Sequence, residues 1–225
     1  VFDLLCGVNA FGAIAVALFS RRAGGVGQRI ETSLLESEVA FLADAAMEYL
    51  VSGHVRGRWG SEHSQIVPYK VFDTADGMVV IGAGYESVFR AFMKVIGRED
   101  LLEAPRFRTL AERVENRDAV YEVLDAEVRR HATADLVERL EHAGVPCAPV
   151  NDMRQVFEHP QVLHRGMLKY LEHPAYGRLP TLGPAVKYSG FDVAGGWRAP
   201  PLMGEHTGQV LDEWLGEAAP AQPRR

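Results

Sequence analysis

The sequence has few cysteines and no excess of positive charge, and both shortages narrow its functional class. Its 225 residues include two cysteines, Cys6 and Cys147, which are too few to form a disulfide framework. This usage favours a reducing compartment, the cytoplasm or, in a eukaryote, the mitochondrial matrix. The formal net charge of −6 provides no cationic surplus for a phosphate backbone. We therefore expect no nucleic-acid partner.

The common sequence signatures of nucleotide, hydrolase and metalloprotease sites are also missing. The chain has no Walker A lysine loop, no GxGxxG motif that opens a helix, no GxSxG elbow and no HExxH motif. Its eight histidines are scattered, and none pairs with a cysteine or an acid at the spacing of metal ligands. We therefore expect no metal site.

One long apolar run is present, and it opens the chain as "VFDLLCGVNAFGAIAVALFSRR". Seventeen uncharged residues separate Asp3 from Arg21, which is the lower limit for a membrane span. The run contains Gly7, Asn9 and Gly12, and no second candidate span follows, so we expect a buried helix and no membrane contact. The chain begins without Met, and we expect a fragment or processed chain with part of the active machinery upstream.

The first sixty residues have the pattern of an α/β layered domain. A helix is predicted over 3–22, with Gly24 and Gly25 as stop signals. The alternating "QRIETS" (28–33) predicts a strand. Ser33 and Glu36 form a capping-box pattern at the start of a second apolar helix over 34–51.

The rest of the chain alternates turn signals with short periodic segments. Residues 52–69 read as a linker or a long functional loop, and Asp76-Gly77 predicts a β-hairpin. Helices are predicted over 86–97, 116–131 with an Asn cap, and 133–144 with a Thr133 cap. A short strand (145–150), a brief helix ended by Pro160, and strand-like pieces such as "LKYLEHP" and "GPAVKYSG" follow. A final helix over about 207–217 precedes "APAQPRR", predicted to be a disordered tail.

Two places have residue types suited to catalysis. Asp3 lies at the start of the first helix, where free N–H groups and the positive end of the dipole stabilise a carboxylate nucleophile or anchor. The same position suits a plain helix cap, since Asp is among the best capping residues. The loop residues Gly60, Ser61, Glu62 and His63 offer backbone N–H groups for an oxyanion or a thioester carbonyl, although a plain interdomain linker has the same composition.

With these residues in view, the chain resembles the C-terminal half of a class III CoA-transferase, the family of formyl-CoA transferase and the carnitine CoA-transferases. Family members carry an Asp, a helix and a "TGKGQ-IDVSLL-S-VA" segment, which correspond here to "DLLCGVNAFGAIAVALFSRRAGGVGQRIETSLLESEVA". The succinyl-CoA:glutarate/hydroxymethylglutarate branch is matched by "RWGSEHSQIVPYKVFDTADG", "GVPCAPVNDMRQVFEHPQVLHRGM", "GPAVKYSG" and "PPLMGEHT". The resemblance runs in order from residue 1 to about 210.

This resemblance implies an α/β fold, with part of a Rossmann-like large domain and a smaller α/β domain, in interlocked homodimers. The large-domain pieces correspond to 1–60 and 166–225, and the small domain to 61–165. Asp3 corresponds to the nucleophilic aspartate, and residues 60–63 to the mobile glycine loop, which reads "GSEH" here. The family has Thr-Gly after the Asp, whereas this chain has Cys6-Gly7. Because of this difference, the resemblance implies no role for the side chain at position 6.

The implied activity is CoA transfer from an acyl-CoA such as succinyl-CoA to a carboxylic acid, with a dicarboxylate as the expected acceptor. Acyl-CoA and small carboxylates are then substrates, and no cofactor is permanently bound. A second carboxylate requires a cation, for which Arg56 and Arg58 are the nearest candidates, although both also fit a solvent-facing linker. Of the two, Arg58 is the predicted substrate-binding residue, together with residues 60–63. An α-methylacyl-CoA racemase of the same family, and a non-catalytic fragment, are the alternatives.

Overall fold

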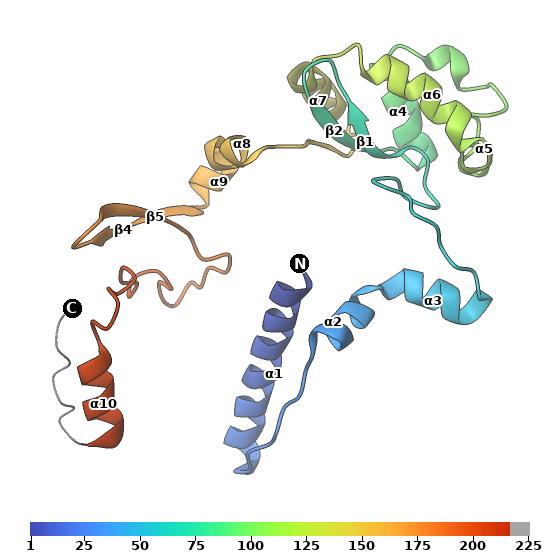
Figure 1. The fold of residues 1–225 in the computed structure, drawn as a ribbon. Coiled ribbons are helices and arrows are strands. Elements are labelled where there is room, and N and C mark those ends of the chain that lie inside the picture. Colours follow the sequence, from blue (N-terminus) through green and yellow to red (C-terminus); the bar gives the residue numbers. More distant parts are fainter. Residues whose placement is uncertain (217–225) are drawn as a thin grey trace. The chain divides into compact units, whose positions relative to one another are not determined.

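The computed structural model describes residues 1–216, and the chain divides into two compact units, Val1–Gln65 and Ile66–Arg225 (Figure 1). The tail predicted to be disordered lies outside the described residues. The first unit contains three helices: α1 (Phe2–Gly24), α2 (Leu34–Phe41) and α3 (Ala43–Ser52). The second unit contains the strands β1 (Tyr69–Asp73), β2 (Met78–Gly82), β3 (Cys147–Pro149), β4 (Leu168–His173) and β5 (Gly177–Leu182). Its helices are α4 (Glu86–Val95), a 3₁₀ turn (Glu99–Leu101), α5 (Leu110–Glu115), α6 (Arg117–Val128), α7 (Thr133–His142), α8 (Met153–Glu158), α9 (Pro160–His164) and α10 (Thr207–Leu215).

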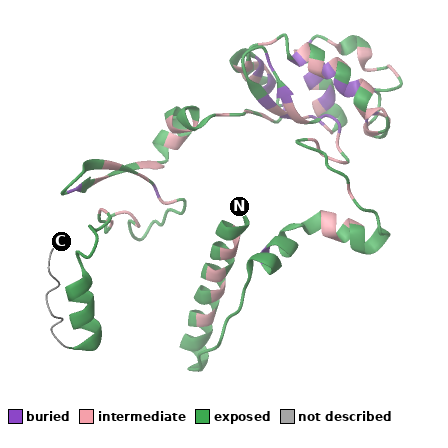
Figure 2. Cartoon of the chain, viewed as in Figure 1, coloured by how far each residue is buried: buried purple, intermediate pink, exposed green. Residues whose placement is uncertain are grey.

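Helix α1 confirms the predicted opening helix and its stop signal. It ends at Gly25, which adopts a left-handed φ of 74° and donates its N–H to the carbonyl of Arg21 at 2.7 Å. The expectation that this helix is buried is wrong for the chain as described, because no α1 residue is buried (Figure 2). By length and composition alone α1 is apolar enough to cross a membrane, a property shared by the core helices of soluble proteins.

The segment after α1 departs from the predicted strand and single helix. Residues 26–33 form no strand, since no other strand is described in this unit to supply hydrogen-bond partners. Ser33 caps α2 as predicted, with its Oγ accepting from the N–H of Glu36 at 3.2 Å. The helix predicted over 34–51 is two helices, α2 and α3, divided at Ala43, whose φ of 44° interrupts the helical backbone.

The second unit contains a three-stranded antiparallel sheet in the order β1-β2-β3. The hairpin predicted at Asp76-Gly77 is confirmed: Asp73 pairs with Met78, and the N–H of Thr74 donates to the carbonyl of Gly77 at 2.9 Å. Inward-facing residues of the sheet are buried, as alternation requires, including Phe72, Val79 and Ile81. The sheet therefore presents one apolar face for helices to cover.

Helices α4, α6 and α7 complete this small α/β core. Helix α6 contacts β1, and α7 contacts α4, β2 and β3. The buried apolar side chains of the described residues all lie between Val67 and Val145, as the purple segments of Figure 2 show. The helices predicted over 86–97, 116–131 and 133–144 are confirmed, with Gly97 and Gly144 at left-handed φ values of 72° and 69° at their ends.

The N-terminal caps of α6 and α7 differ from those predicted. Asn116 precedes α6, but its side chain donates to the carbonyl of Glu112 at 2.8 Å and does not cap the helix. Thr133 is the first residue of α7, and Ala132 is its N-cap. The capping acceptor is Asp76 of the hairpin, whose Oδ1 accepts from Thr133 N at 2.8 Å and Thr133 Oγ1 at 2.7 Å. These bonds lower the pKa of Asp76.

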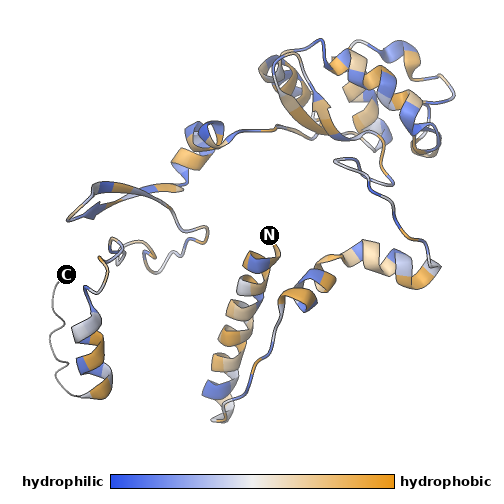
Figure 3. Cartoon of the chain, in the orientation of Figure 1, coloured by the Kyte–Doolittle hydropathy of each residue, from blue (hydrophilic) through white to orange (hydrophobic). Residues whose placement is uncertain are grey.

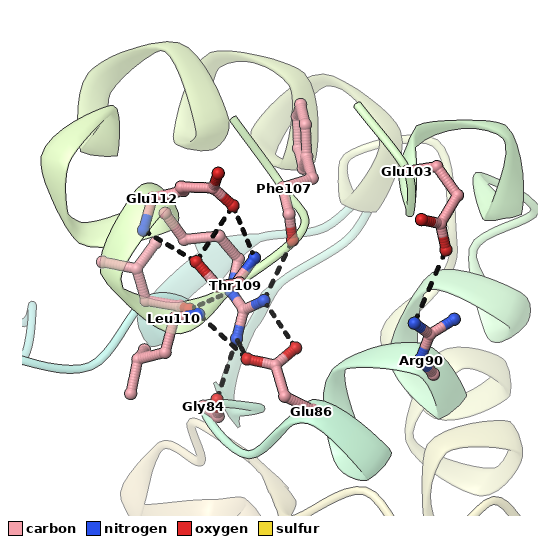
Figure 4. A network of polar contacts seen from close by, with 10 residues as sticks. Gly84, Glu86, Arg90, Glu103, Phe107, Thr109, Leu110 and Glu112 are labelled. Carbon is pink, nitrogen blue, oxygen red and sulfur yellow. Dashed lines mark hydrogen bonds and ion pairs between the residues drawn. The ribbon is translucent and has the colours of Figure 1, made fainter. Parts of the chain in front are cut away.

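A buried guanidinium links three loops of the small core (Figure 4). Arg113 of α5 is fully buried, with 0% of its surface exposed. It donates to the carbonyls of Val67, Phe107 and Gly84, each at 2.9 Å, and to the carboxylate of Glu86 at 3.1 and 3.2 Å. Its guanidinium carbon also lies 4.0 Å from the ring centroid of Phe89. The side chain thus satisfies backbone groups that the surrounding loops leave unpaired.

The remaining elements follow the small core along the chain. The predicted strand at "LKYLEHP" is confirmed as β4, which forms a two-stranded antiparallel sheet with β5. "GPAVKYSG" contains no strand. Pro160 follows the end of α8 and opens α9, as suits a residue without an N–H. The final helix is confirmed as α10 and ends at Gly216, with a left-handed φ of 68°.

Candidate functional site

Asp3 lies in the first turn of α1, which begins at Phe2, one residue earlier than the predicted helix start. The N-cap is Val1, which supplies no side-chain cap, and the first backbone bond of the helix runs from Leu5 N to Val1 O at 3.0 Å. The N–H groups of Phe2, Asp3 and Leu4 therefore have no partner within the helix. Asp3 is exposed, and its carboxylate makes no hydrogen bond or ion pair with other described residues. The structure thus places a solvent-accessible carboxylate at the positive end of a long helix.

Three contacts hold this end of α1 against α2 and the segment before it. The rings of Phe2 and Phe41 meet edge to face, with centroids 6.2 Å apart. Asn9 Nδ2 donates to Ser37 Oγ at 3.1 Å, and Cys6 Sγ lies 4.0 Å from Thr32 Oγ1. Among the described residues of this unit, Ser37 alone is buried. The described residues of this unit therefore place Asp3 through a few separate contacts and not through a core of buried apolar side chains. Cys6 and Cys147 are both free thiols, and burial raises the pKa of Cys147.

The loop predicted to contact substrate contains a tight turn at its centre. The N–H of Glu62 donates to the carbonyl of Trp59 at 3.0 Å, which closes a turn over residues 59–62. Gly60 follows Trp59 in this turn with a φ of 60°, a conformation that favours glycine. A side chain at Gly60 would meet no atom within 4 Å, so the backbone conformation is the constraint there. Ser61 is exposed, Glu62 and His63 are half-buried, and His63 Nδ1 accepts from Gln65 N at 3.1 Å.

A charged cluster, formed by Asp44, Glu48, His54 and Arg56, lies at the base of this loop. Arg56 donates through Nη2 to Asp44 Oδ2 at 2.9 Å and through Nε to Glu48 Oε2. His54 Nδ1 lies 2.7 Å from Glu48 Oε1. The pKa of Glu48 is lowered, first by His54 and then by Arg56, and the pKa of Asp44 is lowered by Arg56. The sequence carried a signal for this cluster, because Asp44 and Glu48 are spaced i, i+4 on α3.

The predicted site residues are therefore only partly brought together. Residues 60–63 share one turn, and Arg58 immediately precedes that turn as an exposed side chain without a recorded partner among the described residues. Asp3 belongs to the same unit, but the structure records no bond between it and residues 58–63. Within residues 1–216 no group of three or more His, Cys, Asp and Glu side chains is placed to hold a metal ion. The roles assigned to Asp3 and to the loop stay predictions.

Comparison with known proteins gives a family match over most of the chain. Residues 1–207 match the family described as CoA-transferase family III. The chain is 38% identical over 213 residues to the succinyl-CoA:glutarate CoA-transferase of Homo sapiens, covering 95% of this chain and 48% of the relative. It is 32% identical over 213 residues to the succinate–glutarate CoA-transferase of Agrobacterium fabrum, covering 95% of this chain and 53% of that protein. The chain thus spans about half the length of the curated relatives it matches.

The fold has a close counterpart among solved structures. A CaiB/BaiF family protein from Brucella suis superposes with a TM-score of 0.79 and 32% sequence identity, over 94% of this chain and 55% of that one. The match confirms the α/β fold class predicted from the sequence. The family match and the human relative confirm the predicted resemblance to the class III transferases and to their glutarate branch.

Proposed function

The chain belongs to CoA-transferase family III, and from this we propose that the protein containing it moves CoA from an acyl-CoA donor to a dicarboxylate acceptor. The observation that carries the proposal is 38% identity, over 95% of the chain, to a protein named for transfer between succinyl-CoA and glutarate. The bacterial relative, at 32% identity, is named for the same pair of dicarboxylates. Succinyl-CoA and glutarate are therefore the first donor and acceptor to test.

In the proposed mechanism Asp3 is the covalent nucleophile. Its carboxylate attacks the thioester carbonyl of the donor, giving a mixed anhydride and releasing CoA thiolate. The thiolate attacks the aspartyl carbonyl of that anhydride, which releases the donor's carboxylate and leaves an aspartyl-CoA thioester. The acceptor carboxylate then displaces the thiolate to form a second anhydride, and the thiolate attacks its acyl carbon. The products are the new acyl-CoA and the regenerated Asp3 carboxylate.

The local geometry of Asp3 suits these steps. Each step passes through an oxyanion, and the N–H groups of Phe2, Asp3 and Leu4 have no partner within α1. The carboxylate is exposed, so a thioester has direct access to it. The turn over residues 59–62 is the second proposed source of backbone N–H donors. Gly60 adopts a left-handed φ in this turn and has no side chain that would block the approach of substrate to the backbone.

The remaining parts of the proposal follow from the chemistry. Carboxylate and thiolate exchange an acyl group without change of oxidation state, so the reaction needs no redox group, and we propose no permanently bound cofactor. Acyl-CoA and small carboxylates are the proposed ligands, and an interlocked homodimer is the proposed assembly. The proposed compartment is the cytoplasm, or the mitochondrial matrix in a eukaryote.

The test is covalent trapping in the full-length protein. Asp3→Asn should lower succinyl-CoA:glutarate transfer by several orders of magnitude, because the covalent route is removed. With donor alone, the wild-type peptide that contains Asp3 should gain the mass of CoA minus water, and the variant peptide should not. Asp118→Asn is the matched control, since Asp118 is an exposed acid in the first turn of α6. Transfer within tenfold of wild type in Asp3→Asn, with deamidation excluded by mass, contradicts the assignment.

A second assay on the full-length protein distinguishes CoA transfer from racemisation. A transferase needs the acceptor acid, whereas a racemase exchanges the α-proton of an acyl-CoA with solvent without any acceptor. We expect glutarate-dependent formation of glutaryl-CoA and no acceptor-independent deuterium incorporation in deuterated buffer. Deuterium exchange without transfer would replace the proposed function with the racemase reaction.

A further inference from the structure

The two arginines of the loop after α3 have opposite environments, although only Gly57 separates them in the chain. Arg56 is mostly covered, with 23% of its side chain exposed, and it contacts two carboxylates of α3, those of Asp44 and Glu48. Arg58 is exposed and has no recorded hydrogen bond or ion pair among the described residues. From the sequence alone both are candidates for binding a second carboxylate, and Arg58 is the one predicted to bind substrate.

The charged cluster around Arg56 is a poor anion site. It contains one guanidinium and two carboxylates, so its formal charge is −1 with His54 neutral and zero with His54 protonated. An incoming carboxylate would have to displace Asp44 or Glu48 from the guanidinium and would gain no net attraction. The cluster instead joins the loop to α3, and Gly53, with a left-handed φ of 71°, turns the chain so that His54 and Arg56 return to that helix.

Other arginines of this unit are less suited than Arg58. Residues 1–65 contain no lysine. Arg21 and Arg22 lie in the last turn of α1, where a cation interacts favourably with the C-terminal end of the helix dipole. Arg29 is paired with Glu31. Arg58 is therefore the arginine of the described unit that is neither neutralised nor at the far end of α1.

We propose that the two arginines have different roles: Arg58 binds the second carboxylate of a dicarboxylate acceptor, and Arg56 is a positioning residue that anchors the loop on α3. The proposal rests on the proposed function and adds the residue that selects the substrate class. A guanidinium presents two parallel N–H donors to a carboxylate and stays charged at every accessible pH. Because Arg58 immediately precedes the turn over residues 59–62, movement of the anchor would displace both the cation and that turn.

The experiment compares two acceptors of equal chain length in the full-length protein, with succinyl-CoA as donor. Glutarate carries the second carboxylate, and pentanoate has a methyl group in its place. Arg58→Gln should lower the ratio of kcat/KM for glutarate to kcat/KM for pentanoate by about tenfold to a hundredfold, because a charge-assisted bond available only to glutarate is lost. Most of that change should be in the KM for glutarate. Arg58→Lys, which keeps the charge and loses the paired geometry, should give an intermediate ratio.

The anchor has a different signature. Arg56→Gln should lower kcat for both acceptors by a similar factor and leave their ratio within about threefold of wild type, since it acts through the position of the loop. Glu48→Gln removes a partner of Arg56 and should give the same pattern, and Arg56→Lys should recover part of the rate. Arg29→Gln is the matched control, an exposed arginine of the same unit, and should leave both kcat and the ratio unchanged.

Three outcomes would overturn the roles proposed for Arg56 and Arg58. An Arg58→Gln ratio equal to that of Arg29→Gln removes Arg58 from acceptor binding. A ratio change in Arg56→Gln but not in Arg58→Gln reverses the two assignments. If the wild-type protein transfers CoA to no dicarboxylate, the proposed function itself is wrong. This outcome is distinct from the first two, because both of those require an active wild-type enzyme. Circular dichroism of each variant shows whether it is folded. If a Gln variant is unfolded, the Lys variant at the same position is compared with wild type in its place.

Discussion

Replacing Arg113 by methionine should destabilise the small α/β core by about 3–5 kcal/mol. The side chain is 0% exposed, and it donates to three backbone carbonyls, those of Val67, Phe107 and Gly84. Methionine fills much of the volume but donates no hydrogen bond. The bonds to Val67 and Phe107 are fully buried, so their carbonyls would be left without a donor or would need a water molecule to enter.

The magnitude follows from how each partner could recover. A buried carbonyl without a donor costs about 1–3 kcal/mol, which gives about 2–6 kcal/mol for Val67 and Phe107 together. Glu86 contributes less, because half of its side chain is exposed and its carboxylate would be rehydrated. Releasing the guanidinium from its buried position offsets part of the loss. Arg113→Lys should cost about 2 kcal/mol, because a single ammonium cannot reach all three loops.

Native-state hydrogen exchange in the full-length protein measures this loss where it occurs. Amides of the β1–β2 sheet and of α6 should exchange about a hundredfold to several-thousandfold faster in Arg113→Met, because each ~1.4 kcal/mol lost from the free energy of opening raises the exchange rate about tenfold. Arg90→Met is the matched control: its ion pair with Glu103, shown in Figure 4, spans 3.5 Å and is 55% and 76% exposed, so about 0–0.5 kcal/mol is expected. Equal exchange in the two variants would refute the role of the buried network.

Two further predictions concern the loop and the cap of α7. Gly60→Val should lower kcat about tenfold with little change in melting temperature, because a β-branched residue disfavours the left-handed φ of 60° in an exposed turn; steady-state kinetics and calorimetry check this, and a large stability loss with normal turnover would mark the turn as structural. Asp76→Ala should speed exchange of the first amides of α7 at pH 7. Since hydrogen bonds from Thr133 lower the pKa of Asp76, this stabilisation is fully present above the unfolded pKa of about 4 and is lost as pH falls through the lower folded pKa. The difference between variant and wild type should therefore shrink as pH falls below about 4, and a difference that does not shrink contradicts the cap.

The sequence predicts best where neighbouring residues decide the structure. Asp76-Gly77 fixes a hairpin because few other dipeptides suit that turn, and Gly25, Gly97 and Gly144 end their helices by adopting left-handed φ values. These signals lie within a few residues of the structure they determine. The small core between Val67 and Val145 is dense in them, and they predict its hairpin and the helices α4, α6 and α7, whereas the short α5 and the 3₁₀ turn were not predicted.

Features that depend on distant contacts were not predictable in this way. The alternation of residues 28–33 is that of a strand, but a strand also needs a partner, and none is described in that unit. Asp76 caps α7 from 57 residues away, so the nearer Thr133 was predicted in its place. Arg113 lies in "AERVE", where nothing distinguishes a buried arginine from an exposed one. For the site, residue types and position single out Asp3 and the loop, and the family resemblance supplies their roles, whereas the pairing of Arg56 with two carboxylates of α3 required the structure.

The contacts that place the proposed nucleophile within the first unit are few. Apolar side chains of α1 such as Leu4, Val8 and Phe11 are 75%, 66% and 72% exposed, and Figure 3 shows apolar residues along the length of this helix. Covering five such side chains would contribute about 10 kcal/mol, at roughly 1.5–3 kcal/mol each. The contacts Phe2–Phe41 and Asn9–Ser37 are worth far less, about 1 kcal/mol apiece. Covalent catalysis requires reacting atoms aligned to within about an ångström. We therefore expect the orientation of Asp3 to depend on whatever covers the apolar side chains of α1, whereas the small α/β core holds its own geometry through Arg113 and its buried side chains.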